Sequence, residues 1–136
     1  MTSEEASRVI AAAQEKAREL KIRVTVAIVD EGAHLQALAR MDSAFPLSAQ
    51  IAEAKATGAA LLHRDGASIA QVHEQRPGFF HAADRLARLP LVPGLGSLVV
   101  RRGEAVLGAV GVSGGKPEED LACAQHGLAA LETSRG

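Results

Sequence analysis

The chain has 136 residues, the length of one small domain, and 47% of them are hydrophobic, as in a packed globular protein. Its 15 basic and 16 acidic residues are interleaved and nearly cancel, which leaves no electrostatic footprint for nucleic acid or an anionic membrane. No apolar stretch approaches the roughly 20 residues that a membrane helix needs. The only aromatic residues are Phe45, Phe79 and Phe80, so platforms for stacking bases are scarce. We therefore expect neither a nucleic-acid partner nor a membrane.

Two features of the sequence favour a cytoplasmic location. The N-terminus, Met1 to Glu5, is acidic, whereas a secretory signal begins with a basic region followed by an apolar run. Cys123 is the only cysteine, so an internal disulfide is impossible and a reducing compartment suits the chain. We predict a cytoplasmic protein with a single domain over residues 1–136.

The first third of the chain predicts a helix followed by a β-hairpin. Thr2 and Glu5 have the spacing of a capping box, and apolar residues recur with a helical period through residues 3–20. The period changes to two over residues 24–28, and residues 34–41 form the expected return strand, with Leu35 on the apolar face.

The remainder predicts helices, a second hairpin and a last helix. The predicted helices cover residues 48–63 with Ser48 as N-cap, 68–74, 80–89 and a final segment that opens at Pro117, and the predicted strands cover 97–101 and 104–112. The strand that ends at Val112 is uncharged from Ala105 onward, so we expect it in the middle of the sheet. Two hairpins among helices imply an α+β fold in which helices flank an antiparallel sheet.

The segment from Gly108 to Gly115 leads from a strand through a glycine turn to the start of a helix. Backbone amides freed by such a turn, together with the positive end of the helix, favour an anion. We predict that Ser113, Gly114 and Gly115 bind a ligand there. The alternative is that the glycines only permit a tight connection.

Two basic residues complete this predicted site. Arg40 ends a strand and Lys55 lies about two turns into the following helix, so their side chains could clamp a carboxylate near the glycine turn. In the alternative, Arg40 pairs with Asp42 or Asp30, and Lys55 is simply solvated.

The histidines and acidic residues offer weaker candidates. No Cys/His cluster has the spacing of a zinc site, but His63, His73 and His81 lie in the middle helices, where an axial ligand to a metal-bearing ring could sit. His34 and Asp120 are candidate proton shuttles. Each of them has an ordinary structural explanation as well, such as the helix dipole for Asp120.

These segments, in this order, resemble the GlcG/HbpS-like heme-binding proteins, a family related to the C-terminal domain of PduO-type adenosyltransferases. The resemblance lies in residues 29–35, 40–44, 48–57 and 108–115, followed by Asp120. It implies a profilin-like arrangement of helices around an antiparallel sheet, assembled as homodimers or higher oligomers such as octamers. It also implies heme or a corrinoid as a possible cofactor.

The sequence and the resemblance together lead to two hypotheses. The first is a homo-oligomeric binding protein that holds heme, a corrinoid or a small organic carboxylate, at or near a subunit interface, through Arg40, Lys55 and the turn at Ser113–Gly115. It would otherwise carry no cofactor. The second is an isomerase, hydrolase or accessory lyase that acts on a carboxylic acid, with His34 or Asp120 moving protons.

Overall fold

A computed structural model describes residues 1–133 as five helices and four strands. Their order is α1 (Ser3–Glu19), β1 (Thr25–Asp30), β2 (Leu35–Arg40), α2 (Leu47–Leu62), α3 (Gly66–Gln75), α4 (Pro77–Leu86), β3 (Ser97–Arg102), β4 (Ala105–Ser113) and α5 (Pro117–Thr133). No helix among these residues is both long and apolar enough to span a membrane.

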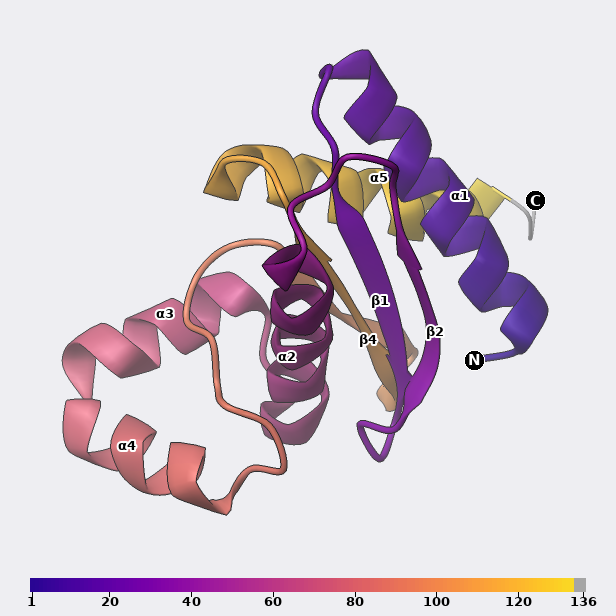
Figure 1. The fold of residues 1–136 in the computed structure, drawn as a ribbon. Coiled ribbons are helices and arrows are strands. Elements are labelled where there is room, and N and C mark those ends of the chain that lie inside the picture. The colour runs from indigo at the N-terminus through magenta and orange to yellow at the C-terminus, as the bar shows by residue number, and fades with distance from the viewer. Residues whose placement is uncertain (134–136) are drawn as a thin grey trace.

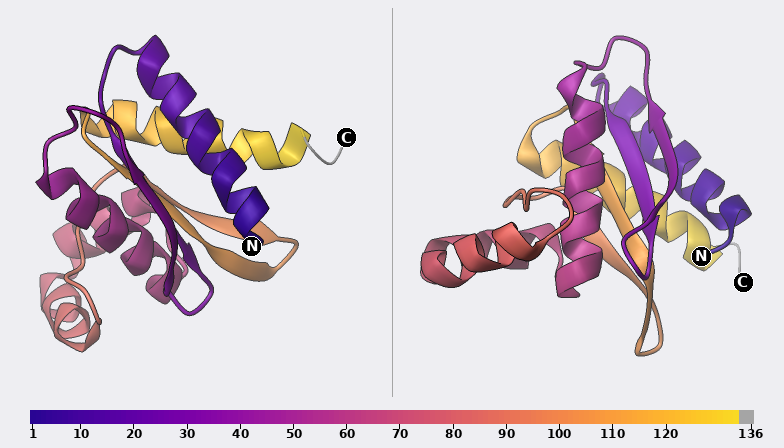
Figure 2. Two further views of the ribbon diagram at one scale, coloured as in Figure 1. Left: turned by 45° about the vertical axis from the view of Figure 1, so that its right-hand side comes forward. Right: turned by 60° about the horizontal axis from the view of Figure 1, so that its bottom comes forward.

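The four strands form one antiparallel sheet in the order β2-β1-β4-β3, which confirms the predicted α+β fold of two hairpins with β4 inside the sheet. β1 joins the hairpins, because it pairs with β2 on one side and β4 on the other. As Figure 1 shows, α1 and α5 pack over one face of the sheet and α2 over the other, while α3 and α4 lie outside α2. The same layers are visible from the two directions of Figure 2.

Each face of the sheet has its own apolar core. Val26 and Ile28 of β1 point into the core beneath α1 and α5, whereas Ala27 and Val29 point toward α2. Because both faces are covered, β1 is buried from Thr25 to Val29. α2 lies close to the sheet because Gly111 has no side chain: a Cβ there would come within 2.2 Å of the Ala52 carbonyl oxygen.

Two predicted details of the first strands and α2 are wrong. Leu35 was expected on the apolar face of its strand, but a β-bulge shifts the register so that it pairs with Val29, and it is 47% exposed. Ser48 does not cap α2, because the helix begins one residue earlier and Pro46 occupies the cap position. The Ser48 hydroxyl instead lies 2.8 Å from the Thr25 hydroxyl, a buried contact between helix and sheet.

The two ends of the chain match the local signals in the sequence. The Thr2 hydroxyl accepts a hydrogen bond from the Glu5 amide and the Glu5 carboxylate accepts one from the Thr2 amide, so the predicted capping box is confirmed. α5 begins at Pro117 as predicted. Cys123 of this helix is fully buried in the core.

Candidate functional site

Lys55 is the centre of a buried polar cluster at the end of β4 and the start of α5. Its ammonium donates to the carbonyl oxygens of Leu95 and Val112 at 3.0 and 2.9 Å and to Asp120 Oδ2 at 3.4 Å. An ammonium has three hydrogens, so each has an acceptor within the chain. Lys55 is only 8% exposed, which excludes the alternative of a solvated lysine.

Asp120 is the carboxylate at this helix start. One oxygen pairs with Lys55, and Oδ1 accepts a hydrogen bond from the Gly115 amide at 2.8 Å. Burial raises the pKa of this carboxyl group, an effect that outweighs the opposite influence of the Gly115 amide and the Lys55 charge.

The amides of the glycine turn therefore already face negative charge from the same chain. Besides the bond from Gly115 to Asp120, the Lys116 amide donates to Glu119 Oε1 at 2.8 Å. A ligand that used these amides would have to displace one of the two carboxylates. Ligand binding by Lys55, Ser113, Gly114 and Gly115 stays a prediction. Such binding would require breaking hydrogen bonds that the chain makes with itself.

Arg40 lies at the same end of the sheet but apart from this cluster. Thr25 pairs with Ser113 on one side and with Arg40 on the other, so Arg40 and Ser113 are two strands apart, about 10 Å between backbones. Arg40 is exposed, and its Nη1 donates to the Ala44 carbonyl oxygen at 3.5 Å. Neither Asp42 nor Asp30 pairs with it, and the Asp30 carboxylate interacts with His34 instead.

Arg40 borders a surface hollow of about 290 Å³ at the edge of the sheet. We call this hollow the arginine hollow, and its lining residues are Gln14, Arg18, Arg23, Ala39, Arg40, Met41 and Asp42. Two of the three arginines, Arg18 and Arg23, were not predicted from the sequence.

The two candidate proton shuttles lie at opposite ends of the sheet. His34 follows the far end of β1, is 76% exposed on its side chain, and has its Nδ1 3.3 Å from Asp30 Oδ1. Asp120 lies at the other end of the sheet. Its Oδ1 accepts a hydrogen bond from Gly115, two residues after Ser113, which pairs with Thr25. Five residues of β1 separate these ends, about 17 Å, so the two groups of one chain cannot act on one small substrate.

The three candidate metal ligands do not converge. His73 of α3 and His81 of α4 have ring centroids 6.3 Å apart, and Phe80 packs edge-on against both. His63 lies at the end of α2 in a left-handed conformation and borders a polar hollow with Arg64 and Arg101. Within residues 1–133, no group of three or more His, Cys, Asp or Glu residues is placed to hold a metal ion.

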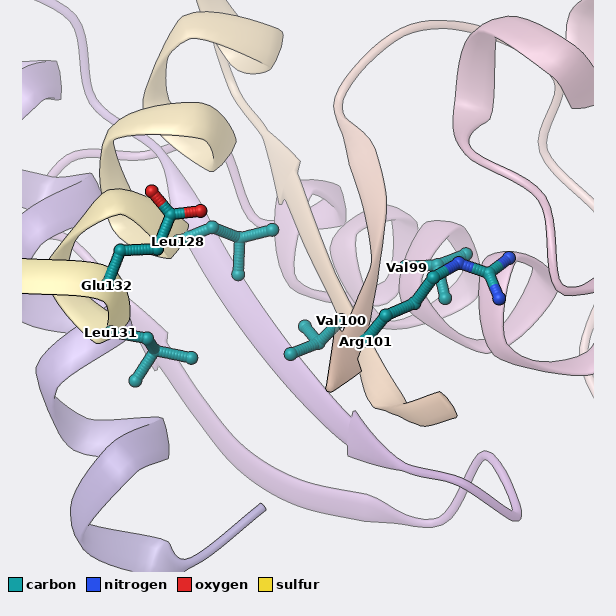
Figure 3. A pocket seen from close by; sticks show the side chains of 6 residues that line it. All are labelled: Val99, Val100, Arg101, Leu128, Leu131 and Glu132. Atoms are coloured by element: carbon teal, nitrogen blue, oxygen red, sulfur yellow. The ribbon is translucent and has the colours of Figure 1, made fainter. Parts of the chain in front are cut away.

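Three further hollows have apolar side chains in their linings. Figure 3 shows Val100, Leu128 and Leu131 facing a hollow of about 220 Å³ between β3 and α5, with Arg101 directed away from them. Two further hollows follow the outer side of α2. One is lined by Gln50, Ile51, Glu53, Ala54, Leu89, Pro90 and Val92, and the other by Leu61, Leu62, Ala83, Leu86, Ala87 and Leu91.

The fold and sequence match known proteins across nearly the whole chain. Protein GlcG of Escherichia coli strain K12 is 39% identical over 116 residues, which is 83% of this chain and 81% of that protein. The crystal structure of the PduOC:heme complex superposes with a TM-score of 0.86 at 27% identity, covering 96% of this chain and 94% of that one. The Klebsiella pneumoniae protein ORFY superposes with a TM-score of 0.85 at 32% identity, covering 97% and 90%.

A four-stranded antiparallel sheet between these helix layers is a small α+β fold, and the chain shares it with the PduOC:heme complex and with HbpS. Residues 1–129 match the family described as "Haem degrading protein HbpS-like". The chain therefore belongs to the HbpS-like family, which confirms the resemblance found in the sequence.

Proposed function

We propose that this chain is a ligand-binding protein whose ligand carries carboxylate groups, with heme, a corrinoid or a small organic acid as the candidates. The likeness to a protein crystallised as a heme complex, over 96% of the chain, is the observation that carries the proposal. A heme has two propionates, so both a tetrapyrrole and an organic acid would need cationic groups on the protein surface.

Among the predicted ligand-binding residues, Arg40 suits this role best. Its guanidinium is exposed and borders a hollow, whereas the Lys55 ammonium is enclosed by Leu95, Val112 and Asp120. We assign Lys55 and the glycine turn to holding this end of the fold in shape, and Arg40 to contact with the ligand.

None of the hollows described above joins an iron ligand to an apolar surface. A bound heme needs an iron ligand beside an apolar surface. The two apolar hollows along α2 contain no His, Cys, Met or Tyr in their linings. Met41 borders the arginine hollow, but it is buried and its sulfur accepts a hydrogen bond from the Val24 amide. A tetrapyrrole would therefore need groups from a second chain.

Self-association is the second part of the proposal. Leu61 and Leu86 border the same apolar hollow between α2 and α4, and Leu86 is 88% exposed. Exposed apolar surface of this kind is typical of an interface. We propose a homodimer or a higher oligomer such as an octamer, in a protein that works in the cytoplasm.

Titrations with three ligands test the proposed function. Ferric heme, heme dimethyl ester and citrate are added separately to the pure protein, with the Soret band followed for the hemes and calorimetry for citrate. We expect saturable binding of heme or citrate, and weaker binding of the ester because its carboxylates are masked. If neither heme nor citrate binds saturably, the proposal is wrong.

A further inference from the structure

Three arginines from separate elements border the arginine hollow. Arg18 belongs to the last turn of α1, Arg23 precedes β1, and Arg40 ends β2. In Figure 1 these three places lie together at the upper end of the sheet, where α1 turns into β1 and β2 leaves toward α2. The hollow thus collects cationic residues from three elements of the fold.

Backbone pairing brings Arg23 and Arg40 to the same end of the sheet. Arg40 is the register partner of Thr25, and the Met41 amide donates to the Val24 carbonyl oxygen at 3.0 Å, which continues the pairing one residue further. Arg23 and Arg40 therefore leave neighbouring chain segments within one hydrogen-bonded end of the sheet.

A side-chain hydrogen bond places Arg18 over the same strand end. Gln14 Nε2 donates to the Ala39 carbonyl oxygen at 3.2 Å and so fixes α1 against β2. Arg18 follows Gln14 by four residues, and residues four apart lie on one face of a helix. Arg18 therefore lies one turn beyond this anchor, toward the end of β2.

None of these three arginines has a carboxylate partner in residues 1–133, since no Asp or Glu oxygen lies within the 4.0 Å of a salt bridge. Asp42 borders the hollow but pairs with none of them. Within residues 1–133, Arg102 is the only arginine that pairs with a carboxylate, that of Glu5 at 3.0 Å. The three arginines are therefore distinguished by bordering one hollow together, and not by lacking carboxylate partners.

The end of a helix explains part of this arrangement. A basic residue in the last turn interacts favourably with the helix dipole, which accounts for Arg18 alone. It does not account for Arg23, which precedes β1, or for Arg40, which ends β2. Like charges gathered around one hollow repel each other, and an anion between them removes that repulsion.

We propose that the arginine hollow is an anion site in which Arg18, Arg23 and Arg40 receive a ligand that carries two or more carboxylates. The inference rests on the proposed ligand-binding function and identifies the part of the chain that would hold the carboxylates. A guanidinium presents parallel N–H donors that match the two oxygens of one carboxylate, so several arginines select for several carboxylates. Small polycarboxylic acids and the propionates of a tetrapyrrole share this chemistry.

Calorimetric titration with citrate tests the proposal, with acetate as the monocarboxylate comparison. We expect citrate to bind more tightly than acetate, and each of R18A, R23A and R40A to weaken citrate binding about tenfold. Asp42→Asn, which removes the nearby negative charge, should tighten it about threefold. Arg8→Ala is the matched control, because Arg8 is exposed on α1 outside the hollow and its loss changes the net charge equally.

The outcomes separate this inference from the proposed function. The site is wrong if citrate binds and the three variants, shown to be folded by circular dichroism, bind it as R8A does. It is also wrong if heme binds with the same affinity to the wild type and to R18A, R23A and R40A; the ligand-binding function then stands without it. If neither citrate nor heme binds to the wild type, both proposals fail together. Tighter binding of heme than of its dimethyl ester, lost in the same variants, would identify tetrapyrrole propionates as the source of the carboxylates.

Discussion

Lys55 Nζ lies 3.4 Å from Asp120 Oδ2, and the two side chains are only 9% and 5% exposed. The pair joins α2 to the start of α5, and the carbonyl oxygens of Leu95 and Val112 complete the surroundings of the ammonium. The charge of Lys55, which the sequence predicted to bind a ligand, is therefore neutralised within the protein. In the proposed function the exposed arginines at the edge of the sheet receive the ligand instead.

Breaking this pair should destabilise the protein strongly. Lys55→Met leaves the Asp120 carboxylate buried without its counter-charge, so we expect a loss of about 3–5 kcal/mol in the free energy of unfolding by urea. Lys16→Met is the control, because Lys16 pairs with Glu19 on the surface and should contribute less than about 1 kcal/mol. D120N should lower the free energy of unfolding much less in the K55M variant than in the wild type. Equal effects of K55M and K16M would refute the structural role.

Two glycine substitutions should have opposite effects on stability, because Gly111 lies where α2 closely approaches the sheet and Gly78 lies in open space on α4. In Gly111→Ala the new Cβ meets the Ala52 carbonyl oxygen and the Ala56 amide nitrogen, so stability should fall by about 1–3 kcal/mol or more. In Gly78→Ala the new Cβ meets nothing within 4 Å, and helix propensity should raise stability by about 0.5–1 kcal/mol. Thermal unfolding of the two variants measures the contrast, and a neutral G111A would contradict the packing described for α2.

Cys123 should resist thiol reagents while the protein is folded. Burial raises the pKa of its thiol to about 11, and the side chain is fully enclosed in the core. We expect Ellman's reagent at pH 8 to react with it only after urea unfolds the chain. Rapid reaction with the native protein would contradict this burial.

The same pKa predicts how stability depends on alkaline pH. As pH rises from the ordinary thiol pKa of 9.0, the unfolded chain loses the Cys123 proton while the folded chain retains it until about 11. Ionisation therefore favours the unfolded state, and stability falls across this window. The free energy of unfolding of the wild type should fall relative to that of Cys123→Ala when the pH is raised from 8 to 10.5. A constant difference would be the contrary result.

Self-association should depend on the leucines between α2 and α4. Leu86 is exposed, so Leu86→Glu should lower the molar mass measured by light scattering without lowering the unfolding temperature. Gln71→Glu adds the same charge at an exposed position of α3 and should leave the mass unchanged. An unchanged mass for L86E would place the interface elsewhere.

The parts of the fold that were predicted correctly depend on short-range signals. The capping box of Thr2 and Glu5, the alternation along β1 and the proline at the start of α5 each act within a few residues. Ser48 was misassigned because its hydroxyl contacts Thr25, 23 residues away, rather than its own helix. Leu35 was misassigned because a bulge changes the register, and the pattern of side chains does not reveal a bulge.

The candidate site was predictable only in part for the same reason. Arg40 borders a hollow, as an exposed cation at the end of a strand can be expected to do. The acceptors of Lys55 lie 40, 57 and 65 residues away, and two of them are backbone carbonyl oxygens that no residue type signals. Arg18 was missed because its proximity to Arg40 depends on how α1 packs against β2. Arg23 could have been found, because it lies just before the strand that pairs with β2 in the predicted hairpin.

The most direct test is an NMR titration with citrate that follows the side-chain Nε–H signals of the arginines and the backbone amides together. If the arginines at the edge of the sheet receive the carboxylates, the signals of Arg18, Arg23 and Arg40 should shift saturably while those of Arg64 and the Gly115 amide stay in place. Shifts confined to the Gly115 and Lys116 amides, or saturable binding without any movement of the three arginine signals, would contradict the account.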